Sequence, residues 1–442
     1  MKKPLSIFLF TLLWTFSAFA YRVMPETDAE EKNISINGSG YIMFGQVGSG
    51  HSFGKQGSNE IHHHWQNFYS GRIDAISQPI DWFRTLISLE IGSAWPIVRE
   101  STIMKETFKL QFRPVLPQAV GIFNFGIDEL VDFEIEAGMM EYAFNTEVKN
   151  LGNYLYRSSA YPLTMVTNID NIYSSLMGAR VQAGFFENQL KFGALMNSIT
   201  HQSPFFDFNL SLYLSYLMPN RLLDVGLGFM FERLIAIDKD ATDCTTLWSA
   251  LGDSTLTLRG QKLDARVTLD IKQIFPDVTI FGENDLKIYA EGAILGLKDP
   301  AYYPDDPNYP GSNLLHRIPL MFGINVPTFK ILDLLTFEME YCSYPYPIDW
   351  WGMSQAAPSP KPANITGTSP DDVKWREIYK TKDNLKWTFY LKKSISKFDI
   401  IGLIANDHIR YETFFPERQF FTEQSLRDNK DWHWYIKLQY NL

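Results

Sequence analysis

Apolar and polar residues alternate with a period of two along most of the chain. Between residues 205 and 217 one parity is apolar and the other is mainly polar: Phe206, Phe208, Leu210, Leu212, Leu214 and Tyr216 against Asp207, Asn209, Ser211, Tyr213 and Ser215. Successive side chains of a β-strand point to opposite faces, so such a segment predicts a strand with one apolar and one polar face. A helix would not separate these residues in this way.

Similar segments recur along the chain, without a convincing helical period and without a fixed repeat of the kind that predicts a propeller. We predict strands near 34–47, 65–77, 82–94, 102–113, 130–143, 176–186, 189–198, 205–217, 222–237, 255–272, 285–298, 317–326, 331–343, 374–391, 397–410 and 431–442. The stretches 119–127 and 374–391 leave room for a further strand each.

Alternation alone fits both a soluble β-sandwich and a membrane barrel. Three features favour the barrel. Many segments reach about ten residues, the length of a tilted membrane crossing. Aromatic residues such as Trp82 and Trp432 lie at strand ends, where a membrane barrel has its aromatic girdles. Connections also alternate between tight turns, at 187–188 and 219–220, and long polar loops. We therefore predict an all-β fold, a transmembrane antiparallel β-barrel of about 16 strands (range roughly 14–18).

The last segment alternates up to the final residue. Its apolar parity consists of Trp432, Trp434, Ile436, Leu438, Tyr440 and Leu442. This strand, together with the N-terminal segment described next, resembles bacterial outer-membrane β-barrels of the porin-like kind. The resemblance implies that the last strand is recognised by the barrel assembly machinery. The terminal residue departs from the pattern, since that family more often ends in Phe or Trp.

The N-terminus has the pattern of an export signal. Lys2 and Lys3 precede a short apolar stretch that ends in Ala18-Phe19-Ala20, a small-x-small cleavage pattern. The predicted organisation is a signal peptide at 1–20, a short segment at 21–33, and a single β-barrel domain at 34–442. Losing the two lysines would lower the formal charge from -10 to -12.

Composition removes several classes of protein. An acidic chain lacks the positive surface that nucleic-acid binding needs, and an aromatic fraction of 15% excludes a disordered chain. No run of 18 apolar residues follows the signal segment, which argues against a transmembrane helix. Cys244 and Cys342 could pair, but two cysteines exclude a disulfide-dependent scaffold.

Three long loops are predicted, near 144–175, 299–316 and 344–373. The last two are rich in proline, which removes backbone donors and does not suit a central strand. Solvated extracellular loops are the plain interpretation, with glycan or calcium binding as the alternative. The stretch 144–175 could fold inward and narrow a pore.

In a barrel, the polar parity of the strands would face the lumen and set ion preference. The candidate pore-lining residues are Asp264, Arg266, Asp270, Lys272, Lys287, Glu291, Glu338, Glu340, Lys386, Lys392 and Lys437. In a sandwich the same residues would simply face water.

Two short motifs match those of enzymes or metal sites, but the residues around them do not fit such a site. Gly50-His51-Ser52-Phe53-Gly54 matches a nucleophile elbow, but a loop-like sequence follows instead of a helix. His62, His63 and His64 would point to alternate faces of a strand, so they cannot converge on a metal by themselves. We therefore predict no catalytic residues, no metal site and no cofactor.

Our prediction is an outer-membrane channel for passive diffusion of small hydrophilic solutes or ions. Net acidity favours cations. Four alternatives stay open: a non-conducting structural or adhesive barrel, a barrel enzyme, a transporter of hydrophobic solutes, and a soluble carbohydrate-binding protein. Residues 21–33 are too few for the plug that a hydrophobic-solute transporter needs. Outer-membrane lipid is the predicted partner, nucleic acid is excluded, and the resemblance adds a homotrimer as one assembly state.

Overall fold

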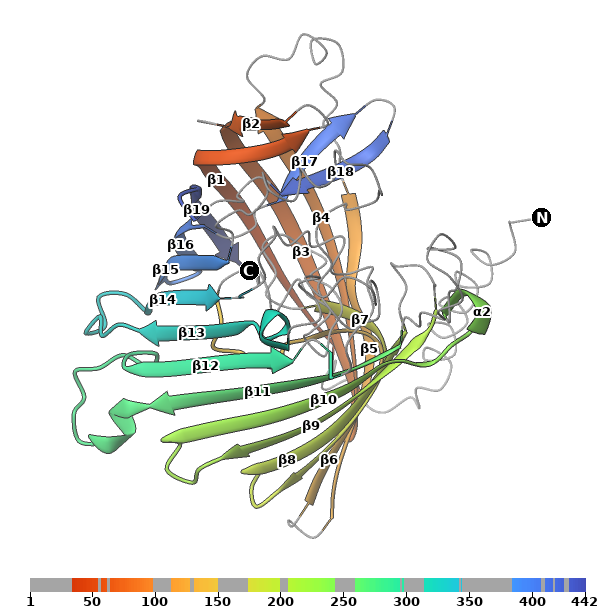
Figure 1. Cartoon of the computed structure of the whole chain (residues 1–442). Coiled ribbons are helices and arrows are strands. Elements are labelled where there is room, and N and C mark those ends of the chain that lie inside the picture. The colour runs from red at the N-terminus through yellow and green to blue at the C-terminus, as the bar shows by residue number, and fades with distance from the viewer. Residues whose placement is uncertain are drawn as a thin grey trace.

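In the computed structural model, the chain forms a closed antiparallel β-barrel of 16 strands. The structure describes residues 34–54, 57–61, 64–97, 113–127, 131–149, 174–198, 206–242, 259–294, 296–297, 314–341, 343, 384–406, 410–415, 418–424 and 429–442. Figure 1 shows the strands following one another in chain order, from the red N-terminal strands to the blue C-terminal ones. The fold confirms the predicted architecture and strand number.

The barrel strands are β1, β3 to β16 and β19. Their bounds are β1 (Ile34–Gly54), β3 (His64–Ile80), β4 (Phe83–Ile97), β5 (Arg113–Ile127), β6 (Val131–Tyr142), β7 (Ser174–Phe185), β8 (Leu190–Ser198), β9 (Phe208–Leu217), β10 (Leu223–Ile235), β11 (Gly260–Asp270), β12 (Lys287–Ile294), β13 (Leu320–Asn325), β14 (Leu334–Tyr341), β15 (Leu385–Ile395), β16 (Phe398–Ala405) and β19 (Trp432–Asn441). Short helical elements lie between the strands: α2 (Lys239–Thr242), η3 (Ile271–Ile274) and η5 (Leu314–Arg317).

The first and last strands close the barrel. On one side β1 pairs with β3, from Ile34 opposite Ser77 to Val47 opposite His64. On its other side β1 pairs with β19, which in turn pairs with β16. Closure leaves no barrel strand with an unpaired edge, which is the condition for spanning a membrane with strands.

The two faces of the wall differ as the alternation predicts. On β4, Ile87, Leu89 and Ile91 point outward and are 46–47% exposed, whereas Ser88 and Glu90 between them are at most 8% exposed. The terminal strand β19 follows the same rule, with Trp432, Ile436, Leu438 and Tyr440 exposed and His433 and Tyr435 buried. An apolar outer surface around a more polar interior is the arrangement of a membrane barrel. No helix in the described part of the chain is long and apolar enough to cross a bilayer.

The connections differ between the two ends of the barrel. One end carries turns as short as Asp81–Trp82 and Ser396–Lys397, and the other carries the longer connections. On the short-turn end, Asp333 joins two hairpins. Its carboxylate accepts the backbone N–H of Ser394 at 2.5 Å and lies 3.3 Å from the ammonium of Lys393. Partial burial acts to raise the pKa of Asp333, but these donors outweigh it and hold that pKa below its usual range.

We expect Asp333→Asn to destabilise the barrel slightly, by about 0.5–1 kcal/mol, because the bonds are to a charged group but are partly exposed. A carboxylate whose pKa is lowered by folding stabilises the fold at pH values above its pKa in the unfolded state. This contribution is lost as the pH falls through its pKa in the folded state. The difference between wild type and variant should therefore vanish at acidic pH. Heat-dependent gel mobility measured at neutral and acidic pH checks this, and an equal difference at both would contradict it.

The predicted strand at 102–113 shares only Arg113 with the described residues, so the structure does not test it. The strand that pairs with β4 is β5 (Arg113–Ile127), which covers the stretch 119–127 where the sequence left room for a further strand. Pro114 and Pro117 obscured it, since proline seldom fits a central strand. In the structure Leu116 and Pro117 form a bulge of β5 opposite the single residue Leu89, and Pro114 pairs with Ile91.

Several strand ends also differ from the prediction. β15 begins at Leu385 instead of 374 and continues to Ile395, and 374–383 lie outside the described part. Three additional strands lie outside the barrel ring at the long-loop end: β2 (Gly57–Ile61), which pairs with β1, and the hairpin of β17 (Arg410–Phe415) and β18 (Arg418–Gln424). Figure 1 shows all three at the same end of the barrel, where β17 contacts β4.

The sequence motifs fall in this region or outside the description. Gly50–Gly54 is the end of β1, paired with β2, so the predicted loop is a strand end, and no helix follows among the described residues. Residues 62 and 63 lie outside the description. So do the predicted signal peptide, the segment 21–33, Cys244, Cys342, and most of the loops at 299–316 and 344–373.

Candidate functional site: a segment across the barrel lumen

The chain turns into the barrel directly after β6. We call residues 143–149 the inner segment. Its side chains Phe144, Asn145 and Val148 are at most 5% exposed, although no strand pairs with them. Four residues before β6 ends, Gly138 has a φ of 129°, and a Cβ there would lie 2.2 Å from the carbonyl oxygen of Ala119. Only glycine fits this position of β6.

The inner segment reaches the opposite wall. Along the pairings from β1, β6 is the fifth strand of the ring and β14 the thirteenth, so they lie half a ring apart. Yet the backbone N–H of Lys149 donates to the carboxylate of Glu338 on β14 at 2.6 Å. The inner segment therefore crosses the lumen and narrows it.

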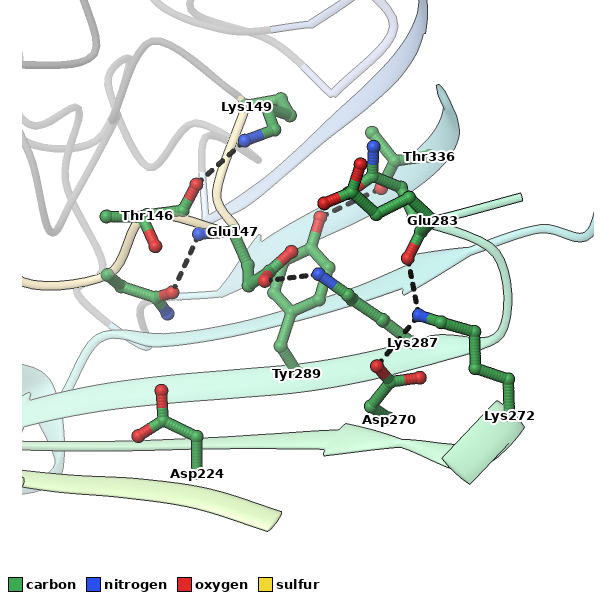
Figure 2. A network of polar contacts seen from close by, with 12 residues as sticks. Thr146, Glu147, Lys149, Asp224, Asp270, Lys272, Glu283, Lys287, Tyr289 and Thr336 are labelled. Atoms are coloured by element: carbon green, nitrogen blue, oxygen red, sulfur yellow. Dashed lines mark hydrogen bonds and ion pairs between the residues drawn. The ribbon is translucent and has the colours of Figure 1, made fainter. Parts of the chain in front are cut away.

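Polar contacts hold the inner segment against β12 and β14, as Figure 2 shows. The ammonium of Lys287 lies 2.7 Å from the carboxylate of Glu147. The Glu147 N–H donates to the side-chain oxygen of Asn145 at 3.2 Å, which fixes the turn locally. From β12, the hydroxyl of Tyr289 donates to Glu338 at 2.6 Å, so this carboxylate is shared between the wall and the inner segment.

Apolar contacts hold its first residues. Phe144 packs over Gly226 and Gly228 of β10, where a Cβ would lie 3.2 Å and 3.7 Å from the ring. Two glycines spaced by two residues leave a flat patch for the ring on the inner face. The guanidinium of Arg266 lies 5.2 Å from the ring centroid of Phe144, within the range of a cation–π contact.

An apolar cluster inside the barrel surrounds this packing. It joins side chains of both walls to the inner segment: Val120, Ile122, Met140, Tyr142, Phe144, Val148, Leu176, Leu195, Tyr213, Tyr289, Ala293 and Met321. A smaller inward cluster on β1, β16 and β19 consists of Met43, Ile401, Leu403, Ala405 and Tyr435. The interior is thus less uniformly polar than the alternation predicts.

The wall from β3 to β7 carries two arginines, each held by two carboxylates. Arg72 contacts Asp74 at 2.8 Å and Glu141 at 2.9 Å. Arg180 contacts Glu134 at 2.5 Å and Glu136 at 2.9 Å. Side chains in these networks keep 9–30% of their surface exposed, so they reach the lumen. With two guanidinium groups and four carboxylates, the networks are acidic.

A buried ion pair marks the long-loop end of the wall. Arg233 and Asp207 are 1% and 0% exposed and lie 2.9 Å apart. Asp207 also accepts the hydroxyl of Thr242 from α2 at 2.6 Å and the backbone N–H of Ile237 at 2.9 Å. These contacts fix the connection after β10, and their full burial gives them no access to a solute.

Comparisons with known proteins are limited to structure. No protein-family model matches the chain, and no curated protein matches it in sequence. Among solved structures, a mutant porin of Rh. blastica aligns at 7% identity with a TM-score of 0.42, covering 92% of this chain and 100% of that one. OmpF of Salmonella typhi, solved with daunomycin, aligns at 8% identity with a TM-score of 0.47, covering 92% and 97%.

The closed ring of 16 antiparallel strands decides the architecture. The chain is an antiparallel β-barrel.

The predicted pore-lining residues occupy the inner parity of their barrel strands, with one exception. Asp264, Arg266, Asp270, Lys287, Glu291, Glu338, Glu340, Lys386, Lys392 and Lys437 alternate with outward apolar residues in β11, β12, β14, β15 and β19. Lys272 lies beyond the end of β11, in η3, where its ammonium bonds Asp270 at 2.7 Å and the carbonyl of Glu283 (Figure 2). Their role in conduction stays a prediction.

These residues differ in the partners that the structure gives them. Lys287 and Glu338 hold the inner segment, Arg266 bonds Asp224 at 3.0 Å, and Lys392 bonds Asp399 at 3.1 Å. Lys437 lies apart from them, with its ammonium 3.9 Å from the ring centroid of Tyr41.

Sequence reasoning missed the arginines and the anchors of the inner segment. Glu134 and Glu136 alternate visibly with Phe133 and Ile135, and Arg72 with Ile73, so the inward parity was readable. The pairing of Arg180 with both glutamates needed the register between β6 and β7, in which Glu136 stands opposite Arg180.

Among the described residues, no three acidic, histidine or cysteine side chains converge as metal ligands.

Proposed function

We propose that the chain is an outer-membrane channel for passive diffusion of small hydrophilic solutes or ions, with its constriction at the inner segment. The observation that carries the proposal is the bond from the Lys149 N–H to Glu338 half a ring away from β6. A ring of 16 strands encloses an aqueous interior, and a segment across it limits the size of the solute. The proposal assigns no enzymatic step to the barrel.

The lumen charge favours cations. The networks of Arg72 and Arg180 carry more carboxylates than guanidinium groups. Lumen-facing carboxylates attract cations and repel anions in a water-filled channel. The residues that set this preference lie on β3, β6 and β7, across the lumen from the strands on which sequence reasoning placed most pore-lining residues.

Outer-membrane location is supported by the exposed apolar face of β4 and β19. Lipid is then the permanent partner, and the assembly machinery acts during biogenesis. A homotrimer is the assembly that we propose for the folded channel. Crosslinking of the protein extracted in mild detergent tests this last point.

Single-channel recording of the purified full chain in a planar bilayer tests the function. We expect stable conductance steps and, under a salt gradient, a reversal potential of the sign expected for cation selectivity. Insertion without steps, with folding shown by heat-dependent gel mobility, would refute the channel. Steps with an anion-selective reversal potential would refute only the assigned selectivity.

A non-conducting barrel is the second candidate. The apolar cluster that joins both walls through Phe144 and Val148 favours it, because buried apolar contacts exclude water from that part of the lumen. The two candidates differ in whether a water path remains beside the inner segment. Conductance in the same bilayer separates them directly.

A further inference from the structure

Two carboxylates on neighbouring strands face each other under the inner segment. Asp264 on β11 and Glu291 on β12 are each 3% exposed. Glu291 stands opposite Arg266 in the register and therefore diagonal to Asp264 on the same inner face. The two carboxyl groups lie within hydrogen-bonding reach of each other, but none of their four oxygens has a hydrogen-bond donor in bonding geometry.

The neighbouring cations have other partners. Arg266, which stands opposite Glu291, turns its guanidinium to Asp224 at 3.0 Å and over the ring of Phe144. Lys287 is held by Glu147 at 2.7 Å. Arg266 attracts both carboxylates but is shared with Asp224, so the two adjacent negative charges are only partly balanced. Burying such a pair is costly unless a proton or a cation lies between the carboxylates.

We propose that Asp264 and Glu291 bind one divalent cation of the hard, oxygen-seeking class, Ca²⁺ or Mg²⁺. Two carboxylates supply the charge that one such ion neutralises, and hard cations complete their shells with water. The Asn145 side chain lies within hydrogen-bonding reach of Glu291, so the ion would sit directly beneath the inner segment. Binding would stabilise the inner segment in its docked position.

The test uses the full-length protein, folded in detergent and stripped with EDTA. Isothermal titration with Ca²⁺ and then Mg²⁺ should show one ion per chain, in the roughly 0.1–1 mM range typical of weak extracellular sites. Asp264→Asn and Glu291→Gln should each weaken this binding about 100-fold or more, because even outer partners of metal ligands change affinity by roughly 10–100-fold. Asp333→Asn, a carboxylate removed at the short-turn end, is the control and should bind as the wild type does.

Thermal unfolding supplies a second measurement that does not require conduction. Added Ca²⁺ should raise the unfolding temperature of the wild type but not of the Glu291→Gln variant, which in EDTA should be at least as stable as the wild type. Absence of binding to the folded wild type, or unchanged binding in both variants, would overturn the proposal. A wild type stabilised by acid but not by Ca²⁺ would assign a shared proton instead. The channel function is tested independently of this site, by the single-channel recording in a planar bilayer.

Discussion

A Phe144→Ala variant should conduct more current per channel than the wild type. Phe144 is 5% exposed and packs on Gly226 and Gly228, so the substitution removes the main apolar anchor of the inner segment. Truncating a buried phenylalanine costs about 3–5 kcal/mol. If most of that loss falls on the docked position, the ratio of docked to displaced inner segment falls by about two orders of magnitude. Displacement opens the lumen.

Single-channel recording checks this result through both the mean conductance and its noise. We expect larger steps with frequent transitions to a level near that of the wild type, since Lys287 and Glu338 still attract the inner segment. The matched control is Phe192→Ala, because Phe192 is 49% exposed on the outer face of β8. Its conductance should equal that of the wild type.

Two outcomes would contradict the assignment of the constriction. Unchanged conductance in a folded Phe144→Ala protein would mean that the inner segment does not limit the current. An equal increase in the Phe192→Ala control would mean that general loosening of the barrel is the cause. A wild type that conducts nothing and a Phe144→Ala variant that conducts would support the non-conducting barrel, with the inner segment as its closure.

The barrel was predictable because its signal is local. In β9 one parity is apolar and the other is mainly polar, and the outer and inner faces of the strand follow directly from parity. The same rule placed β19 to within a residue at each end. Only the second part of β5, at 119–127, was anticipated, because Pro114 and Pro117 interrupt the alternation before it. The structure places Pro117 in a bulge opposite β4, which no local pattern indicates.

The inner segment was much less predictable, since its partners are remote in sequence. Lys149 and Glu338 are 189 positions apart, and no local pattern joins them. From the sequence, the stretch 144–175 could fold either inward or outward. The structure shows that its first residues fold into the barrel. A sequence alone indicates that such a loop is long. Where it docks depends on the glycine patch of β10 and on a carboxylate of β14 that the closed ring brings within reach.

The charge balance of the lumen also depends on contacts between residues that are remote in sequence. Counting charges along the chain gives an acidic protein, but it does not say which charges meet. In the structure Arg180 lies between Glu134 and Glu136, so its positive charge is more than compensated. Selectivity follows from the groups left in excess near the ion path, and these can be changed one network at a time.

Glu134→Gln/Glu136→Gln should lower the preference for cations. The double substitution keeps the side-chain shape and leaves Arg180 with amides in place of carboxylates. One unit charge about 4 Å from an ion changes its energy by about 1 kcal/mol in water, which corresponds to roughly a fivefold change in local concentration. We expect the cation-to-anion permeability ratio to fall by about this factor or more, as the shift in reversal potential under a salt gradient measures.

Asp333→Asn again provides the comparison, since it removes a carboxylate that lies outside the lumen, at a turn. Its reversal potential should match that of the wild type. The effect of the double substitution should also shrink at high salt, because screening weakens the field of a partly exposed charge. A reversal potential that does not move in the Glu134→Gln/Glu136→Gln protein would place the ion path away from β6 and β7. A shift of similar size in Asp333→Asn would show that total charge, and not the position of the carboxylates in the lumen, determines selectivity.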